Sequence, residues 1–305
     1  MADQIDRGIE FDVRAFDPRK VMAVRHRWSD HPLLSVGKLM DLAKRLAAKG
    51  AVRAHADTAT AATDFARAPD TIPAARAPEE IVRDIEKAGA WMALHNVQND
   101  PEYRTLIDAI LDEVAPRVEA KDPGMYGRAG WIFITSPGAV TPYHFDHENN
   151  FILQCLGRKT LHVWEPLDRD TVPPRALEVF HAKLSRDALV YDPSIERRAH
   201  VFELEPGMGG YMPSTAPHWV KNGDGPSITI SATYYTRAIR RTKRIYRLNH
   251  LLRRAGLDPR PEGDSALRDA AKVALARAKD AAQGLARGRG LRMPTPKYAV
   301  DVPLM

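Results

Sequence analysis

The chain has 305 residues, of which 44% are hydrophobic and 28% charged, with one cysteine and a formal net charge of +6. This length allows one large domain with appendages or two domains, and the composition is that of a globular protein. No apolar run is long enough for a transmembrane helix, the N-terminus lacks the pattern of a secretory signal, and a single cysteine excludes an internal disulfide bond. We therefore expect a cytoplasmic protein.

The positive charge belongs to the C-terminal part of the chain. Residues 237–292 contain 16 Lys and Arg against 5 Asp and Glu, a local balance of +11 that leaves about −5 for the rest. The overall charge is therefore weak evidence that the body of the protein binds nucleic acid.

The first 123 residues mix helical and strand patterns and predict an α+β region that packs on the following domain. Ser35 is a good N-cap, leucines follow at helical spacing, and Gly50 suits a helix stop. The expected elements are a helix over 35–49, an irregular loop over 54–78, a short helix over 78–87, a strand over 91–97 and a helix over 100–118.

The pattern changes after Gly124, where short apolar runs separated by Gly, Pro, Asn and Asp are typical of an all-β sandwich or barrel. The runs cover 130–135, 150–156, 160–164, 200–204, 209–213 and 227–235, with a polar insert at 167–199 that has a helical pattern over 175–188. Two helices, about 238–255 and 264–287, are expected after the β region. The predicted domains are 1–123, 124–236 and a basic helical region, 237–305.

A candidate metal site lies in the segment from Thr141 to Asn150. In a strand, residues i and i+2 share a face, so His144 and Asp146 are expected to project together. His218, far along the chain, would complete the two-histidine, one-carboxylate triad of non-haem Fe(II) oxygenases, which leaves three metal positions open. A lone His-x-Asp is common by chance, and a lone histidine near a strand end is more often a hydrogen-bonded core residue.

Lys159 strengthens this interpretation. It lies 15 residues after His144, at the start of the next apolar run. A co-substrate with a distal carboxylate needs a cation, and a lysine ammonium is a compact charge with three donors. A strand lysine more commonly faces solvent, so the position alone does not decide between the two.

The stretch from His144 to Lys159, His-Phe-Asp-His-Glu-Asn-Asn-Phe-Ile-Leu-Gln-Cys-Leu-Gly-Arg-Lys, closely resembles the JmjC and cupin-like 2-oxoglutarate oxygenases, especially the asparaginyl-hydroxylase type. The later Tyr211-Met-Pro and Pro217-His-Trp resemble the second histidine segment of that family. The resemblance covers about 130–235, and it implies a double-stranded β-helix of the jelly-roll type with C-terminal helices.

The resemblance also implies roles for individual residues. His144, Asp146 and His218 would ligate Fe(II), Lys159 would pair with the distal carboxylate of 2-oxoglutarate, and Thr141 would donate a hydroxyl to it. Two further groups are implied, namely Asn150 and Thr233 in the co-substrate pocket and Trp131 and Phe133 as pocket walls, although ordinary core packing explains the two aromatic residues equally well. The family often has Asn or another polar residue at the position of Thr233.

The activity implied by the resemblance is hydroxylation of a C–H bond with O2 and 2-oxoglutarate, releasing succinate and CO2. The substrate would be a protein, a peptide or a small molecule, because a fold does not fix a substrate. One rival is a cupin that binds another metal and uses no 2-oxoglutarate, which would not need Lys159 and Thr141. The other is a non-catalytic cupin-like protein whose basic helices recruit an acidic partner, which would not need an intact triad.

The expected helix at 238–255 has apolar residues among arginines and is amphipathic with a basic face. Three interpretations compete: packing on the barrel or on its twin in a homodimer, recruitment of nucleic acid or an acidic protein, and contact with an anionic membrane. The related hydroxylases often dimerise through C-terminal helices, which favours the homodimer.

Overall fold

The computed structural model describes residues 8–286, and its core is made of two antiparallel sheets. The large sheet has eight strands in the order β1-β2-β10-β7-β12-β5-β4-β3, and the small sheet has four in the order β6-β11-β8-β9. The strands are β1 Ile9–Glu10, β2 Met22–His26, β3 Val52–Ala56, β4 Ala90–Leu94, β5 Tyr126–Thr135, β6 Val140–His144, β7 Asn149–Leu156, β8 Lys159–Val163, β9 His200–Leu204, β10 Met208–Met212, β11 His218–Asn222 and β12 Ser227–Tyr235.

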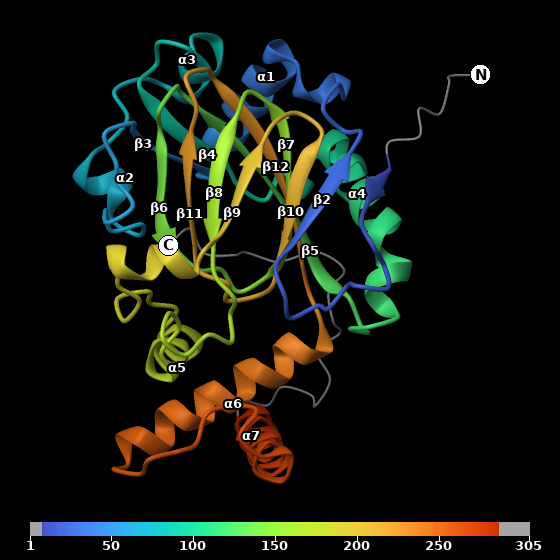
Figure 1. The fold of residues 1–305 in the computed structure, drawn as a ribbon, viewed down its shortest axis with the longest axis vertical. Coiled ribbons are helices and arrows are strands. Elements are labelled where there is room, and N and C mark those ends of the chain that lie inside the picture. Colours follow the sequence, from blue (N-terminus) through green and yellow to red (C-terminus); the bar gives the residue numbers. More distant parts are fainter. Residues whose placement is uncertain (1–7, 287–305) are drawn as a thin grey trace.

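The path of the chain through the sheets identifies the fold. From β5 to β12 the chain passes repeatedly between the two sheets, so that β10-β7-β12-β5 in one stand against β6-β11-β8-β9 in the other. This is the strand order of a double-stranded β-helix, a form of jelly roll. The predicted fold class is therefore confirmed, and β1 to β4 extend the large sheet at both edges (Figure 1).

Helices cover the outer face of the large sheet and gather at one end of the molecule. Leu39 of one helix and Ile107 of another share a core with Ile132 and Leu153 of the sheet. Glycine is required at position 130, since a Cβ there would overlap the Ile107 side chain. The α-helices are α1 Val36–Ala47, α2 Ala68–Thr71, α3 Pro78–Arg83, α4 Pro101–Glu119, α5 Pro174–Lys183, α6 Arg237–Arg254 and α7 Ala266–Ala286. Figure 1 shows α5, α6 and α7 at the end of the sheets where α6 follows β12.

The expected and observed elements differ mainly where the sequence is not periodic. Strands β6 and β11 do not belong to any of the apolar runs, and the expected loop over 54–78 contains the end of β3 and the short helix α2. This loop is held in place, because the backbone N–H of Tyr143 donates to the carbonyl of Ala61 at 3.0 Å. Within residues 8–286, no helix combines the length and the apolar character that crossing a membrane requires.

Candidate metal centre

Neighbouring strands bring the candidate metal ligands together. His144 ends β6, His218 begins β11, and the two residues are direct partners in the β6–β11 pairing. Asp146 follows two residues after the end of β6, in the turn toward β7. One potential ligand atom from each residue lies within 4.8 Å of the others, so the structure assembles the predicted triad from positions up to 74 residues apart in sequence.

The hydrogen bonds of the two imidazoles determine what this cluster can bind. His144 Nδ1 lies 2.7 Å from the carbonyl of Pro142, and His218 Nδ1 lies 3.0 Å from the carbonyl of Ala216. A carbonyl can only accept, so each Nδ1 carries a proton and each Nε2 is the atom turned toward Asp146. These Nε2 atoms lie 3.6 and 3.9 Å from Asp146 Oδ2. When both Nε2 atoms are deprotonated, the three facing groups direct lone pairs toward one another, an arrangement that a cation satisfies.

The pKa shifts of His218 and Asp146 also suit a cation between these groups. Burial, and then the neighbouring His144, lower the pKa of His218 to about 4, so its ring is neutral at pH 7. Burial raises the pKa of Asp146, but His144 and the guanidinium of Arg186 outweigh it and hold that pKa well below its usual range. Two neutral imidazoles and one carboxylate on one side of a metal form the donor set of a non-haem Fe(II) centre.

Arg186 fixes the carboxylate of the triad. Its Nη2 donates to Asp146 Oδ1 at 2.9 Å, and its Nε donates to the carbonyl of Phe145 at 2.8 Å. The second oxygen of Asp146 thus faces the histidines while the first is held by a guanidinium. Partners of this kind orient a metal ligand and favour binding through one oxygen. No pattern in the sequence indicated Arg186, which lies in the polar insert 40 residues after Asp146.

Phe65 covers the metal-facing histidine. Its ring is stacked on His144, with the centroids 3.7 Å apart and the planes 4° apart. The guanidinium carbons of Arg53 and Arg186 lie 4.2 and 5.3 Å from the Phe65 centroid. Phe65 belongs to the segment expected to be an irregular loop, and it closes one side of the site against water.

Lys159 lies in the same narrow cavity as the triad, on strand β8. Its side chain is 4% exposed, and no carboxylate within residues 8–286 pairs with it. Burial lowers its pKa to about 7. The preceding turn requires glycine, since Gly157 has φ of +71° and a Cβ would collide with the carbonyl of Pro226. A buried ammonium without a counter-charge is a receptor for an anionic group.

Two more predicted residues line this cavity. Thr141 Oγ1 accepts a hydrogen bond of 2.7 Å from Trp91 Nε1, which leaves the hydroxyl hydrogen free to be donated. Asn150 Nδ2 donates to Ser231 Oγ at 3.1 Å, and within the described chain Asn150 Oδ1 is buried without a partner. Both Thr141 and Asn150 therefore retain hydrogen-bonding capacity for a ligand.

The remaining predicted residues divide into two groups. Trp131 and Phe133 line the cavity from β5, and Trp131 Nε1 is buried without a partner among residues 8–286. Thr233 is not among the lining residues, and its hydroxyl donates to the carbonyl of Ala129 at 3.3 Å. Ser231, two residues earlier on the same face of β12, lines the cavity instead. The pocket role predicted for Thr233 is thus not supported by its position.

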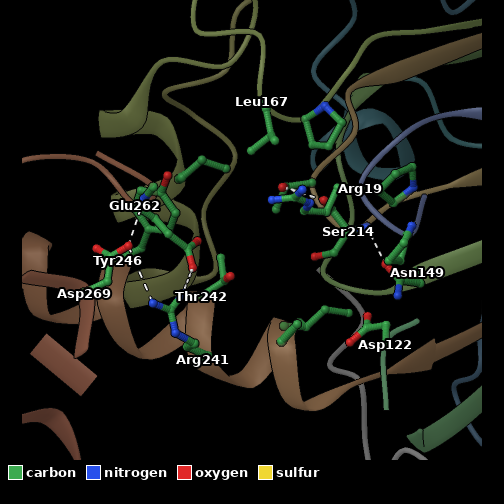
Figure 2. A pocket seen from close by; sticks show the side chains of 18 of the residues that line it. Arg19, Asp122, Asn149, Leu167, Ser214, Arg241, Thr242, Tyr246, Glu262 and Asp269 are labelled. Atoms are coloured by element: carbon green, nitrogen blue, oxygen red, sulfur yellow. Dashed lines mark hydrogen bonds and ion pairs between the residues drawn. The ribbon is translucent and has the colours of Figure 1, made fainter. Parts of the chain in front are cut away.

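A larger cavity of about 560 Å³ lies elsewhere, between the β10–β11 turn and α6. Figure 2 shows Arg241, Tyr246 and Glu262 on one side of it and Asn149 and Ser214 on the other. Its charged groups largely compensate one another, since Arg241 lies 2.7 Å from Glu262 and 3.6 Å from Asp269. The chemistry is therefore expected in the smaller cavity, where Lys159 lies beside the triad and pairs with no carboxylate of residues 8–286.

Comparison with known proteins gives partial similarities. No family model matches the chain. The chain is 28% identical over 118 residues to HSPB1-associated protein 1 of Rattus norvegicus, covering 36% of this chain and 25% of that protein. It is 28% identical over 114 residues to Jumonji C domain-containing protein 5 of Drosophila melanogaster, covering 36% and 28%. The matches thus span about a quarter of the length of these relatives.

Among solved structures, the chain is similar to YcfD, a ribosomal oxygenase from Escherichia coli in complex with cobalt and 2-oxoglutarate. The TM-score is 0.49 at 14% identity, with 91% of this chain and 68% of that chain covered. The strand order, the triad and the similarity to a Jumonji C domain protein confirm the resemblance of the sequence to the JmjC and cupin-like oxygenases.

Proposed function

We propose that this protein is an Fe(II)- and 2-oxoglutarate-dependent oxygenase that hydroxylates a C–H bond of a protein, peptide or small-molecule substrate. One observation carries the proposal. A single cavity contains three converging potential ligands, which suit a metal ion, and an ammonium that pairs with no carboxylate of residues 8–286, which suits a carboxylate of a ligand. A metal-binding protein that used no anionic co-substrate would not need that ammonium, and a non-catalytic relative would not need the complete triad.

The residues of the chain have distinct tasks in this reaction. His144, Asp146 and His218 would hold Fe(II) from one side and leave three positions open. When bound, the iron and 2-oxoglutarate supply the oxidation, in which one oxygen atom of O2 enters the substrate C–H bond and the other enters succinate as CO2 leaves. Lys159 would pair with the far carboxylate of the co-substrate and Thr141 would donate to it. Phe65 shields the site from water.

Succinate formation in the absence of substrate tests the activity. The protein would be purified without oxygen and supplied with Fe(II), ascorbate and 2-oxoglutarate, after which air is admitted and succinate is followed by mass spectrometry. We expect succinate from the wild type and none from His144→Ala. His200→Ala is the matched control, because His200 is half exposed and pairs with Glu165 outside the cavity.

A second measurement separates slow turnover from a wrong assignment. Anaerobic Fe(II) with 2-oxoglutarate gives a visible charge-transfer band only when both bind one metal centre. Absence of both the band and succinate from the wild type would contradict the oxygenase proposal. A band that survives in His144→Ala would contradict the assignment of the ligands.

We also propose that the protein forms a homodimer through its C-terminal helices. Leu267 and Leu275 of α7 are 82% and 55% exposed, and contact with a second copy would remove this apolar surface from water. Light scattering of the purified chain would show a dimer that Leu267→Glu with Leu275→Glu converts to a monomer. A monomeric wild type at micromolar concentration would contradict this proposal.

A further inference from the structure

A basic groove lies on the surface formed by the last three α-helices, away from the metal cavity. We define it by six residues: Lys183 at the end of α5, Arg244, Arg247, His250 and Arg254 of α6, and Lys279 of α7. The hollow between them has a volume of about 200 Å³. Figure 1 shows α6 running between α5 and α7 at this end of the molecule.

The cations of the groove are mostly uncompensated. Among the described lining residues Asp280 is the single acidic one, and it lies 3.5 Å from Arg244. Within residues 8–286, Lys183, Arg247, Arg254 and Lys279 have no ion pair. Burial, together with Lys183 and Arg254, lowers the pKa of His250, which agrees with a local excess of positive charge.

Other cations of α6, outside the groove, form ion pairs with carboxylates. Arg253 lies 2.8 Å from both Glu178 and Asp258, and Arg241 lies 2.7 Å from Glu262. The helix therefore pairs Arg241 and Arg253 with carboxylates, whereas Arg247 and Arg254 along the groove have no ion pair within residues 8–286. A symmetric contact of two copies through this groove would bring like charges together, so a homodimer is expected to use another face.

We propose that the basic groove binds the phosphodiester backbone of a single-stranded nucleic acid. Arg247 and Arg254 are seven residues apart, which places them about 10.5 Å apart along the helix, so they can contact successive phosphates of one strand. The guanidinium fork matches phosphate oxygens. A planar membrane surface reaches the rim of a hollow but not its floor, whereas a single strand can enter it.

The sequence that follows α7 supports a nucleic acid over an acidic protein. After Ala286 the chain reads Arg-Gly-Arg-Gly-Leu-Arg, and no acidic residue occurs between Asp280 and Asp301. Arginine–glycine segments recur in proteins that bind single strands without sequence preference. Because the described lining residues include one imidazole and no other aromatic ring, binding is expected to depend on charge and to tolerate any base.

The test measures how binding of a fluorescein-labelled oligo(U) of about 20 nucleotides depends on salt, by fluorescence anisotropy. Four phosphates neutralised by Lys183, Arg247, Arg254 and Lys279 predict a slope of log Kd against log salt of about 2.8. The double variant Arg247→Gln with Arg254→Gln should lower that slope by about 1.4. Arg14→Gln with Arg25→Gln is the matched control, since both arginines are exposed on the N-terminal part of the chain.

Several outcomes would overturn the proposal. The first is that the wild type does not bind oligo(U) at about 50 mM salt, and the second is that the control variant loses as much salt dependence as the groove variant. The third is that polyglutamate displaces the labelled strand as effectively as unlabelled oligo(U) does. The fourth is that the groove binds phosphatidylserine vesicles more strongly than the oligonucleotide. Binding of oligo(dT) with the same salt slope would support the proposal, because the proposed contact is the backbone.

If the arginine variant does not fold, the double variant Lys183→Gln with Lys279→Gln should lower the slope by the same amount. Succinate formation should be unchanged in both, so this test is independent of the proposed oxygenase activity.

Discussion

Among the described residues, the cation in the metal cavity and four cations of the basic groove have no ion pair, and they lie in opposite surroundings. Lys159 is buried between the two sheets, beside the triad, whereas Lys183, Arg247, Arg254 and Lys279 are exposed around the basic groove. Burial lowers the pKa of Lys159 to about 7. The exposed cations remain hydrated, and they lie together around one groove.

The difference in burial determines which kind of anion each region can bind. A buried ammonium gains much from one well-placed anion, because the surroundings screen the pair only weakly. Such a site suits one small ligand held in one geometry. Exposed cations gain little individually and act through their number and through the release of counterions. The cavity is therefore expected to be specific, and the groove to be general and sensitive to salt.

The largest expected effect is at the metal end of the cavity. His144→Ala should lose tight binding of Co(II), measured by anaerobic titration of its visible absorption, because the remaining Asp146 and His218 cannot enclose the ion from one side. The loss should exceed the roughly 100-fold that removing an outer partner costs. His200→Ala should bind Co(II) as the wild type does, and a normal titration in His144→Ala would place the metal elsewhere.

The charge of Lys159 should decide affinity for 2-oxoglutarate at fixed metal occupancy. Lys159→Met keeps the volume and removes the charge, so the Kd for 2-oxoglutarate should rise about 10- to 150-fold, the equivalent of about 1.5–3 kcal/mol. Binding requires the protonated ammonium. With a pKa of about 7 in the free site, affinity should be constant below pH 7 and fall as pH rises above it.

A calorimetric titration between pH 6 and 9, with saturating metal and no oxygen, would show this dependence. Lys159→Arg is the control, because a guanidinium remains charged throughout and should abolish the slope even if its shape weakens binding. A wild-type affinity that is constant over this range would show that Lys159 is not the carboxylate receptor.

A smaller effect is expected from Arg186, which touches the metal site only through Asp146 and the Phe145 carbonyl. Arg186→Gln should weaken Co(II) binding by about 10- to 100-fold, as loss of an orienting partner does, without abolishing it. Arg186→Lys should recover part of this loss, because it restores the charge but not the two-pronged contact. Equal Co(II) affinity in wild type and Arg186→Gln would mean that Asp146 is held without it.

Local pattern predicts the all-β region and the shared face of His144 and Asp146, whereas the double-stranded β-helix and the role of Lys159 follow from the family resemblance. The apolar runs of β5, β7 and β12 and the His-x-Asp spacing can be read within single strands or their flanking turns, but Lys159 lies two strands after His144. Strands β6 and β11 were not predicted, because neither is an apolar run. Five residues each, with Pro142 or Lys221 among them, carry too little periodicity.

Contacts made by irregular segments could not be predicted. Phe65 and Arg186 reach His144 and Asp146 from a loop and from the polar insert, and neither segment has a period that indicates a direction. Thr233 illustrates a different limit. Ser231 and Thr233 share one face of β12, so the sequence identifies the face, but only the register with β7 decides which hydroxyl reaches the cavity.

The smallest expected effect is that of salt on the buried cavity, and it separates the two regions most directly. Raising NaCl from about 50 to 200 mM should weaken oligo(U) binding at the basic groove about 50-fold, since four phosphates are neutralised. Over the same range the Kd for 2-oxoglutarate should change by less than about twofold, because a buried pair is screened much less than an exposed one. Both ligands can be titrated into the same wild-type preparation with saturating Co(II), with a salt of equal ionic strength but a different anion as the control for specific chloride binding. Equal salt dependence for the two ligands would mean that Lys159 is reached by solvent ions as freely as the groove is, and the distinction between a buried, specific receptor and an exposed, general one would then fail.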